Sequence, residues 1–309
     1  MARSVSAARR LPGGRRLSPI FLRDPSQPSF GLASSSCNDA KRASSRKLIA
    51  FGWYGGKHNH LEWLLPLLPQ CHHYCEPFAG SAAVLINREP SPVETVNDLD
   101  GALAKFFRVL RDAPDEFVQQ VALTPFSREE FYRALYEPGD ELADVERARR
   151  FFVRARQART GLAQTATLGR WANCKNTSRS GMSGVVSRWL NSVHRLPDIA
   201  DRLLRVQIEN RPALDAIRLY DDHNTLFYCD PPYLHSTRGD AKAYGFEMSE
   251  MDHRQLARQL HKCKAKVAIS GYRCKVMDEL YSDWKRHDAP AKNCHSIKKI
   301  RREALWVNF

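Results

Sequence analysis

The sequence predicts an α/β fold whose sheet is assembled from two separate parts of the chain. Strand and helix signals alternate over residues 61–98, and the same alternation returns from residue 206 to the end. The stretch between these parts has helical periodicity and an excess of basic residues. Alternation of strands and helices is typical of an open, mostly parallel sheet. We therefore expect one sheet made from both parts, with a helical segment inserted between them.

Local patterns place the elements of the first part. Small residues at 79–83 follow an apolar run, which predicts a turn between a strand and a helix. The next strand ends at Asn97-Asp98. The expected elements are a helix over 61–68, a strand over 73–78, the small-residue turn, a helix over 84–87 and a strand over 94–96. This order is that of a βαβ unit.

The second part repeats the alternation. Its most apolar run, Leu226–Cys229, predicts a buried strand that leads directly into Asp230. Ser249 and Asp252 have the spacing of a capping box, which predicts a helix start. The expected elements are strands over 206–208, 226–229, 267–270 and 304–309, and helices from residue 249 and over 276–284.

The middle of the chain is predicted to be helical with one long polar interruption. Apolar residues recur at helical spacing over 102–110, 127–135 and 145–159, and we expect helices to continue to about residue 204. Residues 161–187 show no period and are rich in Gly, Ser, Thr and Asn. A stretch of this kind inside a compact domain is usually functional or disordered.

Positive charge is concentrated in this middle segment. The chain has a net charge of +14, and residues 147–211 alone carry fourteen Arg or Lys against three acids, a local net of +11. Such a patch favours binding of a polyanion through phosphate neutralisation and counterion release; the alternative is a solvated basic face. One tryptophan, Trp171, lies among the basic residues, which suits nucleic acid. The residues expected to contact DNA are Arg150, Arg154, Arg170, Lys175 and Arg179.

The first 47 residues differ from the rest of the chain. They carry ten basic residues against two acids, are rich in Arg, Ser and Pro, and lack the apolar stretch of a secretory signal. We expect a disordered basic extension over residues 1–47. An organelle transit peptide and a start codon placed too far upstream are the alternatives.

The spacing of the eight cysteines and the hydropathy of the chain predict neither a metal site nor a membrane span. No CxxC pair occurs, and the CxxxC group Cys71–Cys75 lacks a second half, so we expect no metal site. Free thiols favour a reducing compartment, and we expect a cytoplasmic, nucleoid-associated protein. No run of about 18 apolar residues is present, so no membrane span is expected.

The turn after the buried strand is Asp230-Pro231-Pro232-Tyr233. Two prolines fix φ, remove two backbone donors and hold the preceding aspartate in an extended conformation. A carboxylate and carbonyl oxygens then lie at the carboxyl end of a strand, where α/β sheets bind ligands. This set suits the grip on a planar NH2 group, with a tyrosine ring available for stacking.

A second ligand-binding pattern is the first strand-to-helix turn, Glu76–Ala83. Its small residues permit close approach of a ligand, although it lacks the three glycines of a dinucleotide fingerprint. Asp98 follows about 20 residues later, at the end of the next strand, where an acid binds ribose hydroxyls. The alternative for Asp98 is a residue that starts a turn.

The ordered set of motifs resembles the Dam-type DNA adenine methyltransferases of the D12 class. That family has a Trp-x-Gly-Gly-Lys-like segment, a Glu-Pro-Phe-x-Gly turn, an Asn-Asp acid and a DPPY motif after a strand. The matching segments are Trp53-Tyr54-Gly55-Gly56-Lys57, Glu76-Pro77-Phe78-Ala79-Gly80, Asn97-Asp98 and Asp230–Tyr233. Further family-like phrases are Met251–His253, Ile269–Tyr272 and Glu303–Asn308. The resemblance covers roughly residues 48–110 and 206–309, and it departs at Ala82, where the family usually has a second glycine.

The resemblance implies a Rossmann-like S-adenosylmethionine-dependent methyltransferase sheet with an inserted, mostly helical target-recognition domain. The implied parts are the extension 1–47, the catalytic segments 48–104 and 206–309, and the basic insertion 105–205. The implied cofactor-binding residues are Trp53, Tyr54, Gly55, Gly56, Lys57, Glu76, Phe78, Gly80 and Asp98, and the implied catalytic residues are Asp230, Pro231, Pro232 and Tyr233. Glu209 or Asn210 is a candidate for contact with the adenine of the cofactor.

The expected activity is site-specific transfer of a methyl group from S-adenosylmethionine to N6 of a flipped adenine in double-stranded DNA. An aromatic amine is a poor nucleophile, and hydrogen bonds from N6 to Asp230 and to the Pro231 carbonyl would localise its lone pair and aim it. The base has to leave the duplex, and stacking on Tyr233 would return about 1–3 kcal/mol. Neither a metal nor a covalent intermediate is needed.

Alternative acceptors with the same geometry are N4 of cytosine, an RNA adenine and a glutamine side chain. An inactive methyltransferase fold that only binds DNA and a nicotinamide-dependent enzyme are two further alternatives. We expect a monomer with no obligatory protein partner; a cognate restriction endonuclease would fit a restriction-modification role.

Overall fold

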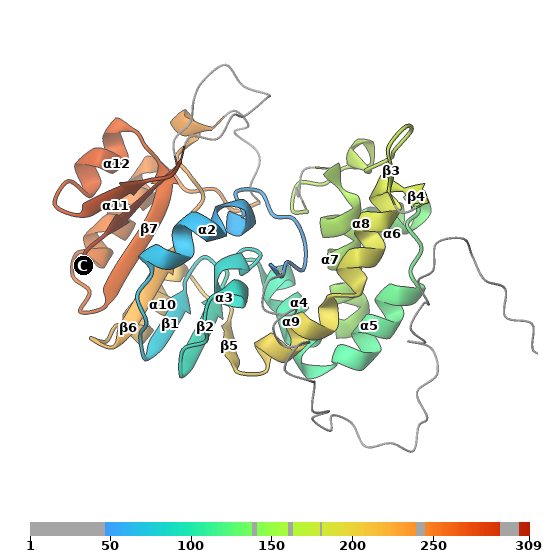
Figure 1. Cartoon of the computed structure of the whole chain (residues 1–309), viewed down its shortest axis with the longest axis horizontal. Coiled ribbons are helices and arrows are strands. Elements are labelled where there is room, and N and C mark those ends of the chain that lie inside the picture. Colours follow the sequence, from blue (N-terminus) through green and yellow to red (C-terminus); the bar gives the residue numbers. More distant parts are fainter. Residues whose placement is uncertain (1–46, 138–140, 160–162, 180, 239–244, 291–302) are drawn as a thin grey trace, which may run out of the picture. The chain divides into compact units, whose positions relative to one another are not determined.

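A seven-stranded sheet combines strands from both ends of the described chain (Figure 1). The computed structural model describes residues 47–137, 141–159, 163–179, 181–238, 245–290 and 303–309, so the predicted extension lies outside the described residues except for Lys47. The strands are β1 (His73–Glu76), β2 (Val93–Asn97), β5 (Val206–Glu209), β6 (Thr225–Cys229), β7 (Lys266–Tyr272), β8 (Lys285–Asp288) and β9 (Glu303–Val307). Their order is β5-β2-β1-β6-β7-β9-β8, and the pairs from β5 to β7 are parallel, whereas β9 is antiparallel to both neighbours.

The prediction of a mostly parallel α/β sheet from two parts of the chain is confirmed. The six expected strands are present, but β8 was not expected. Its sequence, Lys-Arg-His-Asp, has no apolar residue, and it forms the exposed edge of the sheet. An edge strand with a solvated face needs no apolar alternation, and charged residues protect such an edge.

Alternate residues of the central strands pack on opposite faces of the sheet. On β6, Leu226 and Tyr228 belong to one apolar cluster, and Phe227 and Cys229 belong to the other. This is the period of two expected for a strand buried on both faces. The helices α10 (Ala213–Tyr220), α11 (Glu250–Leu260) and α12 (Lys275–Leu280) cover the second face with apolar side chains.

Helices α2 (Leu61–Leu64) and α3 (Ala83–Asn87) pack on the first face. The expected capping box of α11 is confirmed, because the Ser249 side chain accepts from the Asp252 backbone and the Asp252 side chain accepts from the Ser249 backbone. Helix α12 ends at Leu280, four residues earlier than expected.

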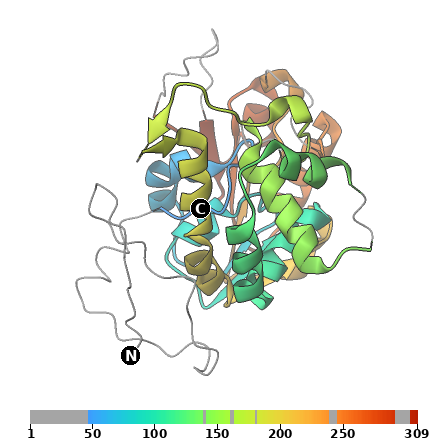
Figure 2. The same cartoon turned by 90° about the vertical axis from the view of Figure 1, so that its right-hand side faces the viewer.

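The segment between β2 and β5 is mostly helical, as expected. It contains α4 (Gly101–Asp112), α5 (Pro114–Leu123), α6 (Arg128–Tyr136), α7 (Asp144–Gln157), a two-stranded ribbon of β3 (Ser178–Arg179) and β4 (Met182–Ser183), α8 (Gly184–Val193) and α9 (Leu196–Leu203). Figure 2 shows these helices, green to yellow, packed together. The rings of Phe106 and Phe151 lie 5.2 and 5.4 Å from Phe51, so the segment shares a core with the first face of the sheet.

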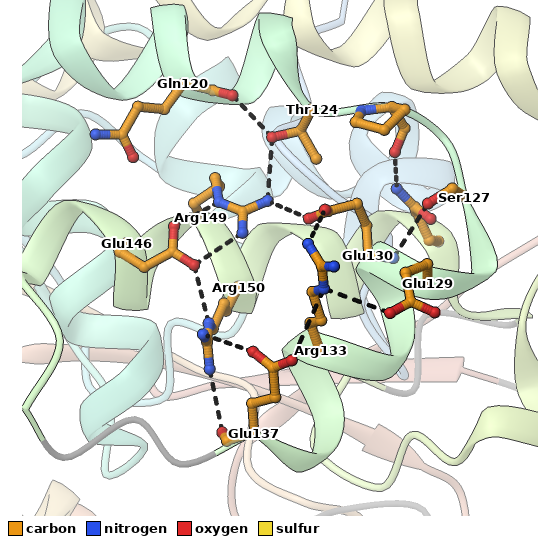
Figure 3. A network of polar contacts seen from close by, with 12 residues as sticks. Gln120, Thr124, Ser127, Glu129, Glu130, Arg133, Glu137, Glu146, Arg149 and Arg150 are labelled. Carbon is orange, nitrogen blue, oxygen red and sulfur yellow. Dashed lines mark hydrogen bonds and ion pairs between the residues drawn. The ribbon is translucent and has the colours of Figure 1, made fainter.

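Part of the positive charge of this segment is neutralised inside it (Figure 3). Arg149 contacts Glu146 at 2.5 Å and Glu130 at 2.8 Å, and Arg150 contacts Glu146 at 2.9 Å and Glu137 at 3.3 Å. All three glutamates lie before residue 147 in the sequence. A charge count over residues 147–211 therefore overstates the free charge, because the fold brings acids of α6, of the residue that follows it and of the first turn of α7 against the basic side of α7.

Candidate active site

A cavity of about 320 Å3 lies at the carboxyl ends of β1, β2 and β6 and is lined by residues from both parts of the sheet. This is the place where the strand order of an open sheet reverses direction and ligands bind. Of the sequence-predicted site residues, those that line the cavity are Trp53, Tyr54, Gly56, Lys57, Glu76, Phe78, Gly80, Asp98, Asp230 and Pro232. Gly55, Pro231 and Tyr233 lie next to these residues in the chain but are not part of the lining.

A tight turn places Lys57 in the cavity wall. The Gly56 N–H donates to the Trp53 carbonyl at 3.0 Å, and Gly55 has a φ of +75°. A positive φ at the third position of a four-residue turn favours glycine. The turn brings the Lys57 side chain, only 4% exposed, under the end of β6.

The strand-to-helix turn after β1 wraps closely around Trp53. A Cβ atom at Gly80 would lie 2.8 Å from the indole ring, and Gly80 has a φ of +48°. Ala82, which occupies the place of the family's second glycine, also adopts the left-handed region with a φ of +49°. That conformation costs a residue with a side chain about 1–2 kcal/mol, so the turn keeps a glycine-like shape without the glycine.

Glu76 supports this turn from the end of β1. Its carboxyl group is buried and accepts from the Tyr74 hydroxyl at 2.9 Å and from the Leu85 N–H at 2.7 Å. Leu85 lies in the first turn of α3, where Ala82 has no side chain that caps the helix. Burial raises the pKa of Glu76 to about 8, so the group is mostly protonated at neutral pH.

Asp98 faces the same turn from the end of β2. It accepts from the Gly80 N–H and from the Asp100 N–H, each at 2.9 Å. Burial raises the pKa of Asp98 to about 6, although these backbone donors stabilise the ionised form. The carboxylate is thus held in a fixed orientation at the cavity wall, where it can accept hydrogen bonds from a ligand.

Asp230 is held at the end of β6 by partners from distant parts of the chain. Lys57 Nζ lies 2.6 and 2.7 Å from its two carboxylate oxygens, and the Ser270 hydroxyl donates to its Oδ1 at 2.8 Å. Burial alone would lower the pKa of Lys57, but the carboxylates of Asp230 and Glu303 outweigh burial and raise it. An ammonium ion and an oriented carboxylate therefore meet in the cavity wall.

The remainder of the Asp230–Tyr233 turn is buried. Tyr233 is 5% exposed, its hydroxyl donates to Glu303, and its ring packs against Tyr272 and lies under Lys57 Nζ. Its ring face is therefore occupied, and stacking of a base on it stays a prediction. His253 donates from Nε2 to the Pro232 carbonyl at 2.9 Å, since a carbonyl oxygen only accepts.

Glu209 and Asn210 do not line the cavity. Glu209 accepts from Tyr220 at 2.7 Å and from Arg211, and the Asn210 amide donates to the carbonyls of Asp98 and Leu99. Residues 212–214 form that part of the wall instead. Contact of Glu209 or Asn210 with the adenine of a cofactor stays a prediction.

Sequence reasoning gave no role to several residues that the structure brings to the site. Ser270, His253 and Glu303 lie within the family-like phrases, which were the available signal. Gln164 carries no such signal. Its amide donates to Asp100 at 2.7 Å and accepts from the Gly245 N–H at 2.9 Å, so it joins the polar stretch of the helical segment to the cavity wall.

The residues expected to contact DNA lie in different environments. Arg154 donates to the Ala134 carbonyl at 2.7 Å, and Arg150 is only 13% exposed and bonded to two glutamates. Lys175 and Arg179 are exposed, on and beside the β3–β4 ribbon, and Arg170 is half-buried. DNA contact by these five residues stays a prediction, and the surroundings of Arg150 and Arg154 indicate a structural role.

The sheet order and a cavity at the carboxyl ends of its central strands are consistent with a methyltransferase fold. Comparison with family models gives a match to the D12 class N6 adenine-specific DNA methyltransferases over residues 53–301. The chain belongs to this family, and it is an adenine-specific DNA methyltransferase. Comparison with curated proteins gives no match.

No helix within the described ranges has both the length and the hydropathy that a membrane span requires.

Proposed function

We propose that this enzyme transfers the methyl group of S-adenosylmethionine to N6 of an adenine that has left the DNA duplex and entered the cavity. The observation that carries the proposal is the convergence of Asp230 and the Gly80 turn on one cavity. Asp230 offers an acceptor for an amine, and the Gly80 turn holds Asp98 as an oriented acid in the cavity wall. Such a pairing suits a reaction between an NH2 group and a second, ribose-bearing ligand.

The residues of the cavity fit the cofactor. The absent side chain at Gly80 leaves the Trp53 indole directly against the turn, and Asp98 presents a carboxylate for the ribose hydroxyls. The bound cofactor supplies the activated methyl group. Trp53, Phe78 and Gly80 would bind it, and Asp98 would orient it by accepting hydrogen bonds.

Asp230 acts on the amine. Its Oδ1 accepts from Lys57 and Ser270, whereas Oδ2 accepts from Lys57 alone among the described residues and so can accept an N6 hydrogen. The Pro231 carbonyl would accept the other hydrogen. Positioned acceptors localise the lone pair on N6 and exclude other orientations, which is the main contribution the protein makes to the rate.

The helical segment between β2 and β5 is proposed to recognise the target DNA. Support comes from the exposed Lys175 and Arg179 at the β3–β4 ribbon and from the basic composition of residues 147–211. The proposed boundaries are residues 105–205 for this part and 48–104 with 206–309 for the catalytic part. The first boundary falls within α4, so the segment and the sheet are joined by a continuous helix.

The test uses duplex DNA and S-adenosylmethionine with an isotopically labelled methyl group. Nucleosides from the digested product are separated and identified by mass spectrometry, and label is expected only in N6-methyldeoxyadenosine. Asp230→Ala should abolish incorporation and leave duplex binding intact, whereas Asp283→Ala, which removes a 66% exposed carboxylate away from the cavity, should keep full activity. Label in cytosine alone, or an active Asp230→Ala variant, would refute the proposal.

A further inference from the structure

One buried cation lies between two carboxylates beside the cavity. Lys57 Nζ is 2.6 Å from Asp230 and 3.5 Å from Glu303, and the three side chains are 4%, 18% and 7% exposed. Asp230 is the acceptor in the proposed function, whereas Glu303 does not line the cavity. The proposed methyl transfer assigns no role to Glu303.

Three elements fix this arrangement. Glu303 is the first residue of β9 and pairs in register with Tyr272 of β7. Its Oε1 atom accepts from the Tyr233 hydroxyl and is also the oxygen that faces Lys57 Nζ at 3.5 Å. Among the described residues, the other titratable groups that face this cluster are the hydroxyls of Tyr228, Tyr233 and Tyr272 and the carboxyl group of Glu76. Burial raises the pKa of Tyr228 and Tyr233 well above the usual range and that of Glu76 to about 8, so these three groups are neutral or mostly neutral at pH 7.

Methyl transfer creates a proton that the site has to remove. The N6 lone pair forms the new bond to the methyl carbon. The electron pair of the broken carbon–sulfur bond stays on the sulfur atom. The nitrogen then carries one hydrogen too many, and its N–H bonding pair returns to nitrogen when the proton moves to Asp230 Oδ2. Asp230 becomes neutral at this step, and Lys57 loses a charged partner while it remains buried.

We propose that Glu303 is a positioning residue that serves as the second counter-ion of Lys57 and so allows Asp230 to take up the proton. The inference rests on the proposed function. As Asp230 is neutralised, the ammonium group stays paired with a carboxylate that never contacts substrate. Without Glu303, protonation of Asp230 would leave a buried ammonium ion with no carboxylate partner, which is strongly unfavourable.

The pKa of Glu303 agrees with this role. Burial raises it, Lys57 opposes the rise, and Asp230 adds to it. Loss of the negative charge on Asp230 removes one of the causes that raise the pKa of Glu303. Glu303 therefore becomes a better carboxylate partner for Lys57 at the moment when that partner is needed.

The first test is a stability cycle without DNA or cofactor. Asp230→Asn reproduces the neutral state of Asp230 at constant shape, and Glu303→Gln removes the proposed counter-ion. Each single variant leaves Lys57 one carboxylate, whereas the double variant leaves none. The equilibrium constant for unfolding in urea should rise in the double variant at least about tenfold more than the product of the two single effects. An additive cycle would overturn the inference.

The second test is the rate of transfer by Glu303→Gln. The turnover number kcat should fall about 10- to 100-fold, with the KM for S-adenosylmethionine and the affinity for duplex DNA within about threefold of wild type. The low-pH limb of kcat should move to lower pH, since Lys57 then attracts the Asp230 carboxylate alone. A purely structural role would move KM and stability but not this limb. Wild-type kcat in this variant would also overturn the inference.

Glu279→Gln is the matched control, because it removes a 51% exposed carboxylate near Lys275 and should change neither readout. The outcomes separate the two proposals. If the wild-type enzyme labels no adenine, the proposed function fails whatever the stability cycle shows. If it labels adenine while the cycle is additive and Glu303→Gln is fully active, only the role of Glu303 fails.

Discussion

Asp98 is expected to make the affinity for S-adenosylmethionine depend on pH in the slightly acidic range. Its carboxyl group is held by two backbone donors beside the Gly80 turn, and burial raises its pKa from 3.8 to about 6. A ribose hydroxyl donates to the ionised form, so protonation of Asp98 and cofactor binding compete. The perturbation is therefore a titration from pH 7.5 to pH 5.

The magnitude follows from that pKa. At pH 7.5 the group is almost fully ionised, and at pH 5 about one molecule in eleven has the ionised form. The dissociation constant for the cofactor should therefore rise about tenfold between these two pH values. The pKa of Glu76, another carboxyl group of the cavity, is about 8, so Glu76 stays mostly protonated below pH 7 and contributes little to this change.

Stability without ligand should change in the opposite direction. The pKa of Asp98 in the folded state lies above its ordinary value, so the folded chain retains a proton that the unfolded chain has lost between about pH 4 and pH 6. The contribution of Asp98 to stability is present below pH 4 and is lost as the pH rises through 6. A higher pH thus lowers the stability of the ligand-free protein and increases its affinity for the cofactor.

Isothermal titration calorimetry at half-unit pH steps measures the affinity. Asp98→Asn should bind more weakly at pH 7.5 and show no dependence on pH between 5 and 7.5. A wild-type dissociation constant that is flat over this range, or an equal pH dependence in Asp98→Asn, would show that Asp98 does not hold the cofactor.

The remaining predictions concern the Gly80 turn, the Asp230 turn and the basic segment. Gly80→Ala places a methyl group 2.8 Å from the Trp53 ring and should reduce the free energy of unfolding by about 1–3 kcal/mol in urea titrations, whereas Gly169→Ala, with open space around it, should be neutral. His253→Ala removes the donor to the Pro232 carbonyl and should lower the single-turnover rate constant of methyl transfer about tenfold, with unchanged DNA affinity. An unchanged rate constant would exclude that role. Arg150→Ala should lower stability by about 1–3 kcal/mol without change in the salt dependence of DNA binding. Arg179→Ala should instead reduce the slope of log affinity against log salt by about 1, and the reverse pattern in fluorescence anisotropy would mean that Arg150 is the phosphate contact.

Much of the site could be predicted from local sequence because its turns obey local rules. Proline residues after a buried strand fix the Asp230 turn, and small residues after β1 fix the Gly80 turn, whatever lies elsewhere in the chain. The strands β1, β2, β6 and β7 could also be predicted from the sequence, since burial on one or both faces leaves an apolar pattern. The exposed edge strand β8 carries no such pattern.

Charge balance could not be predicted from local sequence. The basic window 147–211 excludes Glu130, Glu137 and Glu146, which lie against its arginines in the folded chain. Tyr233 looks like an open stacking surface in sequence, yet Lys57 and Glu303 occupy its surroundings. Both outcomes depend on residues that no spacing rule connects.

The sequence by itself determined the class of fold, the two turns that line the cavity and the family, because each depends on patterns within a few residues or on the order of motifs. The tertiary structure alone decided which ions meet. Lys57 and Asp230 are 173 residues apart, and Glu303 joins them from the last strand. Electrostatic energy depends on distance in space and on burial, and neither can be read along the chain. The Asp230 turn was therefore predictable, whereas the pairing of its carboxylate with a buried lysine was not.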